Sequence, residues 1–111
     1  MANNLTQLHE LADLILSIEQ SMRAADLWHA QAPTPAAMAS RTPFCADTLA
    51  FSEWLQFVFI PRMRTLIEQN AALPGASAIA PLAEEALAEK PGKQEIVERL
   101  REFDRVITAN V

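Results

Sequence analysis

The sequence predicts an all-α protein: a bundle of four to five helices around a central apolar helix kinked by a proline. Three observations predict this class. Apolar residues recur at spacings of three and four in the first and last segments, as they do on amphipathic helices. Strand signals are missing, since the chain has two glycines and no alternating β-branched runs. The middle holds "FSEWLQFVFIPRM" at 51–63, which would be apolar on nearly every side of a helix.

Length and composition limit the classes of function. The 111 residues predict a single domain, 1–111, and half of them are apolar, as in a globular protein. A net charge of −5 argues against direct nucleic-acid binding, which depends on a field of Lys and Arg. The one cysteine, Cys45, excludes an intramolecular disulfide and fits a reducing compartment, so we expect a cytoplasmic protein.

No targeting or membrane segment is expected. The first residues, "MANNLTQLHE", lack the basic and apolar regions of a signal peptide. The most hydrophobic segment, 49–60, is shorter than the ~20 apolar residues that cross a bilayer, and it contains a glutamate. We therefore expect no membrane association.

The first helix should start near Asn4, a good N-cap with Gln7 three residues later, and continue for about twenty residues. Its predicted apolar stripe sets the face that meets the core. The stripe consists of Leu5, Leu8, Leu11, Ala12, Ile15, Ile18 and Met22.

The segment 30–46 contains three prolines and predicts a connection with at most one helical turn, started by Thr34 and Pro35. Asp47 is expected to cap the apolar helix that follows. Pro61 removes a backbone donor and crowds the Phe57 carbonyl, so this helix should kink or restart there.

Two further helices follow in the second half of the chain. Helical character continues after Pro61 until "LPG" at 73–75, and a short helix should begin at Pro81 and run to the Pro91–Gly92 pair. The last segment predicts a surface helix with exposed charge pairs, Glu95/Arg99, Glu98/Arg101 and Glu102/Arg105. Its buried face should contain Ile96, Val97, Leu100, Phe103 and Ile107.

The apolar helix is the first candidate for a functional surface. A helix that is apolar all round is either buried on all sides or binds something, and burial is the simpler interpretation. Arg62 would lie on the same stripe as Leu55 and needs an acidic partner, for which Glu84 or Glu85 are nearest in sequence. Alternatively, Arg62 binds the carbonyls freed by Pro61, or an anionic ligand. The candidate ligand- or partner-binding residues are Gln56, Phe57, Phe59 and Arg62.

Catalytic motifs are not found. His9 and His29 have no metal-ligand spacing, so we expect no metal, and the glycines form no phosphate loop. Adjacent Glu84 and Glu85 point in different directions, and Cys45 has no neighbouring histidine. We therefore expect a protein that is not an enzyme and holds no cofactor.

The chain resembles, over nearly its whole length and most strongly in the middle, the YqcC-like family of small uncharacterised bacterial proteins, found in gammaproteobacteria. That resemblance implies an all-α bundle and no established activity. Some members carry labels that tie them to a tRNA pseudouridine synthase encoded nearby, an enzyme that uses a catalytic aspartate in a mixed α/β fold. The family often has methionine where Leu49 stands. The matching elements are Trp28, Pro33, "TPFCADTL" at 42–49, "EWLQFVFIPRM" at 53–63, "LPG" at 73–75 and "AIAPLAEEAL" at 78–87.

The sequence favours a non-enzymatic helical-bundle interaction module or accessory protein that contacts an unknown protein partner. One alternative is a small-ligand-binding protein whose pocket lies between the Pro61 kink and the "LPG" loop, with Gln56 and Arg62 as polar anchors. Another is an accessory to an RNA-modifying enzyme such as a tRNA pseudouridine synthase. The sequence does not indicate an oligomeric state.

Overall fold

A computed structural model describes residues 5–73 and 77–108. These residues form helices and no strand, so the all-α class is confirmed. Because α3 and α4 are joined end to end by a π-helical turn, the described residues make five separate helical segments and one 3₁₀ turn. The elements are α1 (Leu5–Ala24), α2 (Pro35–Met38), the 3₁₀ turn η1 (Pro43–Cys45), α3 (Phe51–Trp54), the π-helical turn η2 (Leu55–Phe59), α4 (Ile60–Glu68), α5 (Ile79–Ala86) and α6 (Lys93–Thr108).

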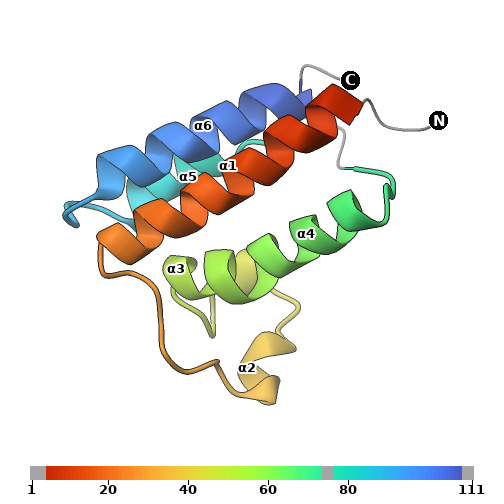
Figure 1. Cartoon of the computed structure of the whole chain (residues 1–111). Helices are drawn as coiled ribbons and strands as arrows, with labels where there is room; N and C mark the ends of the chain where they lie inside the picture. Colours follow the sequence, from red (N-terminus) through yellow and green to blue (C-terminus); the bar gives the residue numbers. More distant parts are fainter. Residues whose placement is uncertain (1–4, 74–76, 109–111) are drawn as a thin grey trace.

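Helices α1 and α6 lie side by side and form the centre of the bundle (Figure 1). Helix α5 packs on α6, while α4 packs on α1, below it in Figure 1. Helix α2 and its loops lie furthest from this pair. The core forms where the apolar faces of α1, α4, α5 and α6 meet.

The apolar stripe of α1 is buried from Leu8 to Met22, but Leu5 and Ala12 are exposed, contrary to the expectation. At 3.6 residues per turn, Leu5 lies about 100° around the helix from Met22, and Ala12 lies at the edge of the stripe. The true stripe is therefore narrower than the spacing of apolar residues indicated. In α6 all five residues of the predicted face are buried, which confirms that face.

Pro61 is accommodated within a continuous helix by the π-helical turn η2. The Ile60 N–H donates to the Leu55 carbonyl five residues back, one residue further than in an α-helix. Because this turn is wider, the helix tolerates the missing N–H of Pro61 and leaves room for the proline ring. The helix therefore continues from α3 into α4, with Leu55, Phe59 and Ile60 buried.

Two predicted helix starts are resolved by the structure, and Asn4 lies outside the described residues. Thr34 caps α2 as expected, because its Oγ1 accepts from the Ala37 N–H at 3.2 Å. Asp47 does not cap the apolar helix, which begins only at Phe51. Its carboxylate instead accepts from the Ser40 hydroxyl at 2.5 Å, and this hydrogen bond lowers the pKa of Asp47.

Helix α5 begins at Ile79 and not at Pro81, because a carboxylate from α6 caps it. Asp104 accepts from the Ile79 N–H at 3.1 Å and from the Ala80 N–H at 2.8 Å. It also accepts from the Ser77 hydroxyl at 2.5 Å. One side chain thus satisfies two free donors of α5 and ties it to α6.

Gly92 brings the start of α6 against the end of α1. A Cβ at this position would lie 2.5 Å from the Ala25 Cβ, and the φ of Gly92 is +84°. Both the contact and the backbone conformation therefore require glycine. Nearby Ala88 also has a positive φ, +49°, but it is exposed and carries the strain without such a contact.

We predict that Gly92→Ala lowers the free energy of unfolding by about 2–4 kcal/mol, because it combines a left-handed backbone with an overpacked contact. Urea unfolding followed by circular dichroism measures this change. Ala88→Gly is the matched control and should raise stability by up to ~1 kcal/mol, since glycine relieves its strain. A Gly92→Ala midpoint equal to that of the wild type would contradict the close approach to Ala25.

Candidate functional site

The four residues predicted to bind a ligand or partner do not share one environment. Gln56 and Phe59 are buried, Phe57 is partly buried and Arg62 is exposed. None of them lines any of the four hollows described below. None of these four hollows therefore lies at the site proposed for a small ligand near Pro61. That alternative stays a prediction.

Gln56 fastens the loop after α1 to the apolar helix. Its Oε1 accepts from the His29 N–H at 2.7 Å, and its Nε2 donates to the His29 carbonyl at 2.9 Å. The oxygen and the nitrogen of the Gln56 amide thus both hydrogen-bond to the backbone of one residue, His29. This arrangement accounts for a glutamine in an otherwise apolar helix.

His29 also lies beside Ser52, a neighbour that its position in the sequence does not indicate. Its Nε2 lies 2.9 Å from the Ser52 hydroxyl, and Ser52 is buried. A Ser–His pair is part of many nucleophilic sites, but such sites also need a group that orients the imidazole and space for a substrate. In the described residues no carboxylate hydrogen-bonds to the His29 ring, and Ser52 lines none of the four hollows, so the pair holds the loop in place.

The predicted pairing of Arg62 with Glu84 or Glu85 is wrong, since neither forms an ion pair with it among the described residues. Glu84 lies 3.3 Å from the Lys93 ammonium and 4.0 Å from the Arg101 guanidinium. Arg62 is exposed and needs no buried acidic partner. The physical reason is η2: its extra residue turns everything after it by about 100°, so Arg62 leaves the stripe that contains Leu55.

An aromatic cleft lies beside η1. Phe44 and Cys45 both have positive φ, 60° and 50°, which turns the Phe44 ring onto Trp54 in an edge contact with centroids 4.8 Å apart. Cys45 is buried, and its Sγ lies 3.9 Å from the Ser40 carbonyl, so the thiol behaves as a small core residue. Phe44 borders a hollow of about 220 Å³, whose lining is apolar throughout: Phe44, Ala46, Leu49, Phe51, Leu82 and Ala86.

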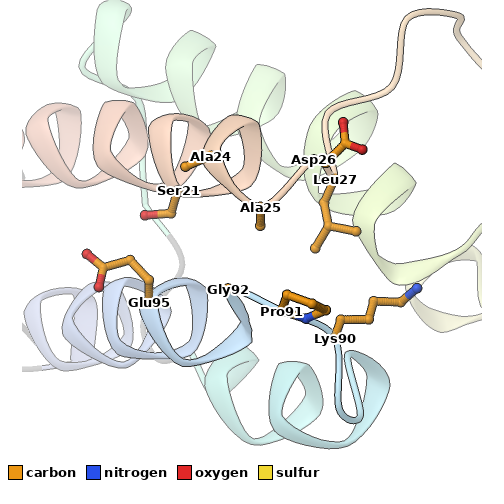
Figure 2. A pocket seen from close by; sticks show the side chains of 9 residues that line it. All are labelled: Ser21, Ala24, Ala25, Asp26, Leu27, Lys90, Pro91, Gly92 and Glu95. Atoms are coloured by element: carbon orange, nitrogen blue, oxygen red, sulfur yellow. The ribbon is translucent and has the colours of Figure 1, made fainter.

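The hollow at the Ala25–Gly92 junction has a volume of about 520 Å³ and is open to solvent (Figure 2). Figure 2 shows the charged groups of Glu95 and Lys90 at its opposite ends. Glu95 is engaged by Arg99 at 2.6 Å, and the Ser21 hydroxyl donates to the Ser17 carbonyl. The polar groups that line this hollow do not converge on one point, although a ligand site would require that. The hollow near Asp104, of about 560 Å³, surrounds the cap of α5.

Another hollow lies between α1 and α4. We call it the α1–α4 groove, and it encloses about 270 Å³. The two helices run in opposite directions, because Arg64 meets Glu19 while the later residues of α4 meet the middle of α1. Leu16, which is 50% exposed, forms part of its wall. The lining consists of Ala12, Ile15, Leu16, Arg64, Ile67 and Glu68.

Glu19 closes one end of the groove with ion pairs. Its carboxylate lies 3.0 Å from the Arg23 guanidinium in α1 and 2.6 Å from that of Arg64 in α4. Burial acts to raise the pKa of Glu19, but hydrogen bonds from Arg64 and Arg23 outweigh it and hold this pKa below its usual value. Glu19 thus holds α4 against α1 in its ionised form.

Residues 5–73 and 77–108 contain neither a metal-binding cluster nor a membrane-spanning helix. No cluster of three or more histidine, cysteine, aspartate or glutamate side chains is placed to hold a metal ion there. None of the helices in these ranges combines the length and apolar character that a bilayer-spanning segment needs.

Comparison with known proteins identifies the family. The family model described as tRNA pseudouridine synthase C (DUF446) matches residues 10–106. The chain is 38% identical over 93 residues to a Haemophilus influenzae protein named "Uncharacterized protein", covering 84% of this chain and 88% of that protein. It is 39% identical over 89 residues to the Escherichia coli "Uncharacterized protein YqcC", covering 79% and 82%. The chain belongs to the YqcC family.

The YqcC fold is known from E. coli. The solution NMR structure of protein YqcC from E. coli matches with a TM-score of 0.84 at 33% identity, covering 96% of this chain and 92% of that one. The resemblance seen in the sequence is therefore confirmed. A Pectobacterium carotovorum protein named "tRNA pseudouridine synthase C" is 36% identical over 66 residues, which is 60% of this chain but only 18% of that protein.

We predict that Gln56→Ala lowers the free energy of unfolding by about 2–3 kcal/mol, because it leaves the His29 N–H and carbonyl without their partner. Arg62→Ala, at the exposed position predicted for the same site, is the control and should change stability by less than about 0.5 kcal/mol. Urea unfolding measures both. If Gln56→Ala were as stable as the wild type, the amide would not be the fastening that the distances indicate.

We predict that Glu19→Gln lowers stability at pH 7 by about 1 kcal/mol and that the difference disappears in acid. A lowered folded-state pKa means that the contribution is complete above the unfolded-state pKa, about 4.3, and is lost as the pH falls through the folded value. Calorimetric melting of both proteins at neutral pH and below pH 4 measures the difference. A difference of the same size at both pH values would contradict the role of the ionised carboxylate.

Proposed function

We propose that this protein is a non-enzymatic accessory module that binds an RNA-modifying enzyme of the tRNA pseudouridine synthase kind. The observation that carries the proposal is the partial likeness to the Pectobacterium protein of that name, in which the matched segment is 18% of the whole. A segment similar to this chain thus occurs within a much longer protein named for that activity. A separate chain of the same fold would meet its enzyme by docking.

The structure supports a docking role more readily than a catalytic one. The polar groups that could do chemistry have structural duties: Asp104 caps α5, Asp47 binds Ser40, and Ser52 and His29 hold a loop. The exposed large apolar side chains are Leu5, Leu16 and Phe44 within the described residues. Apolar side chains grouped on a surface indicate protein contacts.

Charge supports a protein partner over tRNA itself. With a net charge of −5, the chain as a whole repels phosphates, and the arginines of α4 and α6 are largely paired with acids. Contact with RNA would then be left to the enzyme. The proposal includes a cytoplasmic location, where an enzyme acting on tRNA finds its substrate.

We predict that the purified protein binds the tRNA pseudouridine synthase of its own organism as a stoichiometric complex and forms no pseudouridine by itself. Isothermal titration calorimetry and size-exclusion chromatography with light scattering measure the complex, and mass spectrometry of a tRNA transcript measures pseudouridine. The transcript alone is the control for direct RNA binding.

Two results would contradict this proposal. Absence of heat and of co-elution with the synthase at concentrations up to ~100 µM would remove the enzyme as partner. Formation of pseudouridine by the purified chain alone would show that it is itself an enzyme.

A further inference from the structure

The geometry points to the α1–α4 groove as the docking site, and we propose that its occupant is an amphipathic helix with basic flanks that belongs to the synthase. This inference rests on the proposed function and adds to it a surface and the chemistry of the partner segment. Three observations carry it: an exposed apolar stripe, an incomplete second wall, and a pair of carboxylates along the edges.

The stripe lies on α1, on the face next to its buried one. Leu5 is 66% and Leu16 50% exposed, although both are large apolar residues. They are eleven positions apart, which is three turns, so they share one face about 16 Å long. His9 and Ala12, between them on this face, are exposed as well. Two leucines, an alanine and a histidine thus follow one face at the spacing with which one helix packs on another.

The second wall of the groove is short. Ile67 and Glu68 of α4 stand opposite Ala12 and Leu16, and α4 ends at Glu68. Leu5 lies two turns beyond, where α4 gives the stripe no wall. The lining of the groove is apolar apart from Arg64 and Glu68, and the exposed face of α1 continues beyond it to Leu5, so a helix could lie lengthwise along α1. Glu19, Arg23 and Arg64 close its other end.

The charges at the edges select the occupant. Asp13 borders the stripe on α1 and Glu68 borders it on α4; both are exposed, and neither forms an ion pair among the described residues. Lysine or arginine flanking the apolar face of an incoming helix would meet these carboxylates. An RNA phosphate would be repelled. A second copy would bring its own Asp13 and Glu68 to this surface along with Arg23 and Arg64, so it is less basic than the proposed helix.

The Phe44 cleft is the weaker candidate, although Phe44 is 41% exposed. Its ring already covers Trp54, and its left-handed backbone serves that contact, so its position has an internal explanation. Leu16 has no such contact to explain it. The two surfaces therefore offer a matched comparison.

The experiment titrates the purified synthase into variants of the full chain by isothermal titration calorimetry. Leu16→Asp should weaken binding at least tenfold, because it places a charge in the seam, while its melting temperature should stay close to that of the wild type, since Leu16 is half exposed. Phe44→Ala, at the other exposed apolar site, should leave the affinity unchanged. Glu68→Lys should weaken binding several-fold, whereas Glu98→Lys, with the same change of charge on the exposed side of α6, should not.

Each other outcome overturns the inference. Unchanged affinity for Leu16→Asp, or loss with Phe44→Ala alone, would place the synthase elsewhere and leave the proposed function standing. Equal effects of Glu68→Lys and Glu98→Lys would show that only net charge matters. A wild-type dimer that Leu16→Asp dissociates would make a second copy the occupant. If the wild type does not bind the synthase, the proposed function and this inference fail together.

Discussion

The pairing of α1 with α6 is the constraint on which the rest of the structure depends. Each helix presents one stripe to the other, and Ile18, Leu100 and Phe103 are almost completely buried in the core that results. α5 is then held on α6 by the Asp104 cap, and α4 on α1 by Glu19. Because α1 gives its best apolar face to α6, α4 covers only part of the neighbouring face. The exposed leucines of α1 follow from that geometry.

Periodicity predicted the local elements well, because it reports which residues a helix must hide. The buried face of α6 and most of that of α1 follow directly from spacings of three and four, and the Thr34–Pro35 start from local capping chemistry. What periodicity did not predict depends on contacts between distant segments. Asp104 lies 24 residues from the Ala80 N–H that it caps, and Gln56 lies 27 residues from His29. No local pattern indicates such pairs.

The candidate site was predicted less well, for a reason that can be traced to one turn. The prediction that Arg62 lies on the same stripe as Leu55 assumed an uninterrupted α-helix. The π-helical turn η2 adds one residue before Pro61 and so rotates the residues after it around the helix axis. The apolar residues around Pro61 then divide: Phe59 enters the core, where its ring meets Phe103 edge-on with centroids 5.0 Å apart. Leu16, by contrast, was not part of the predicted stripe of α1, and the structure shows it half exposed beside the groove.

Acidity limits how such a protein can influence an enzyme that acts on RNA. With a net charge of −5 the chain as a whole does not attract phosphates, so under the proposed function its effect would pass through the protein–protein contact. A rigid, antiparallel pair of helices suits that task, because a preformed groove loses little conformational entropy when a partner helix enters it. The Glu19–Arg64 ion pair joins α1 to α4, and the Gln56–His29 hydrogen bonds fasten the loop after α1 to η2. Under the proposed function, the ion pair between Glu19 and Arg64 would thus help to set the spacing of α1 and α4, and with it the helix that the groove accepts.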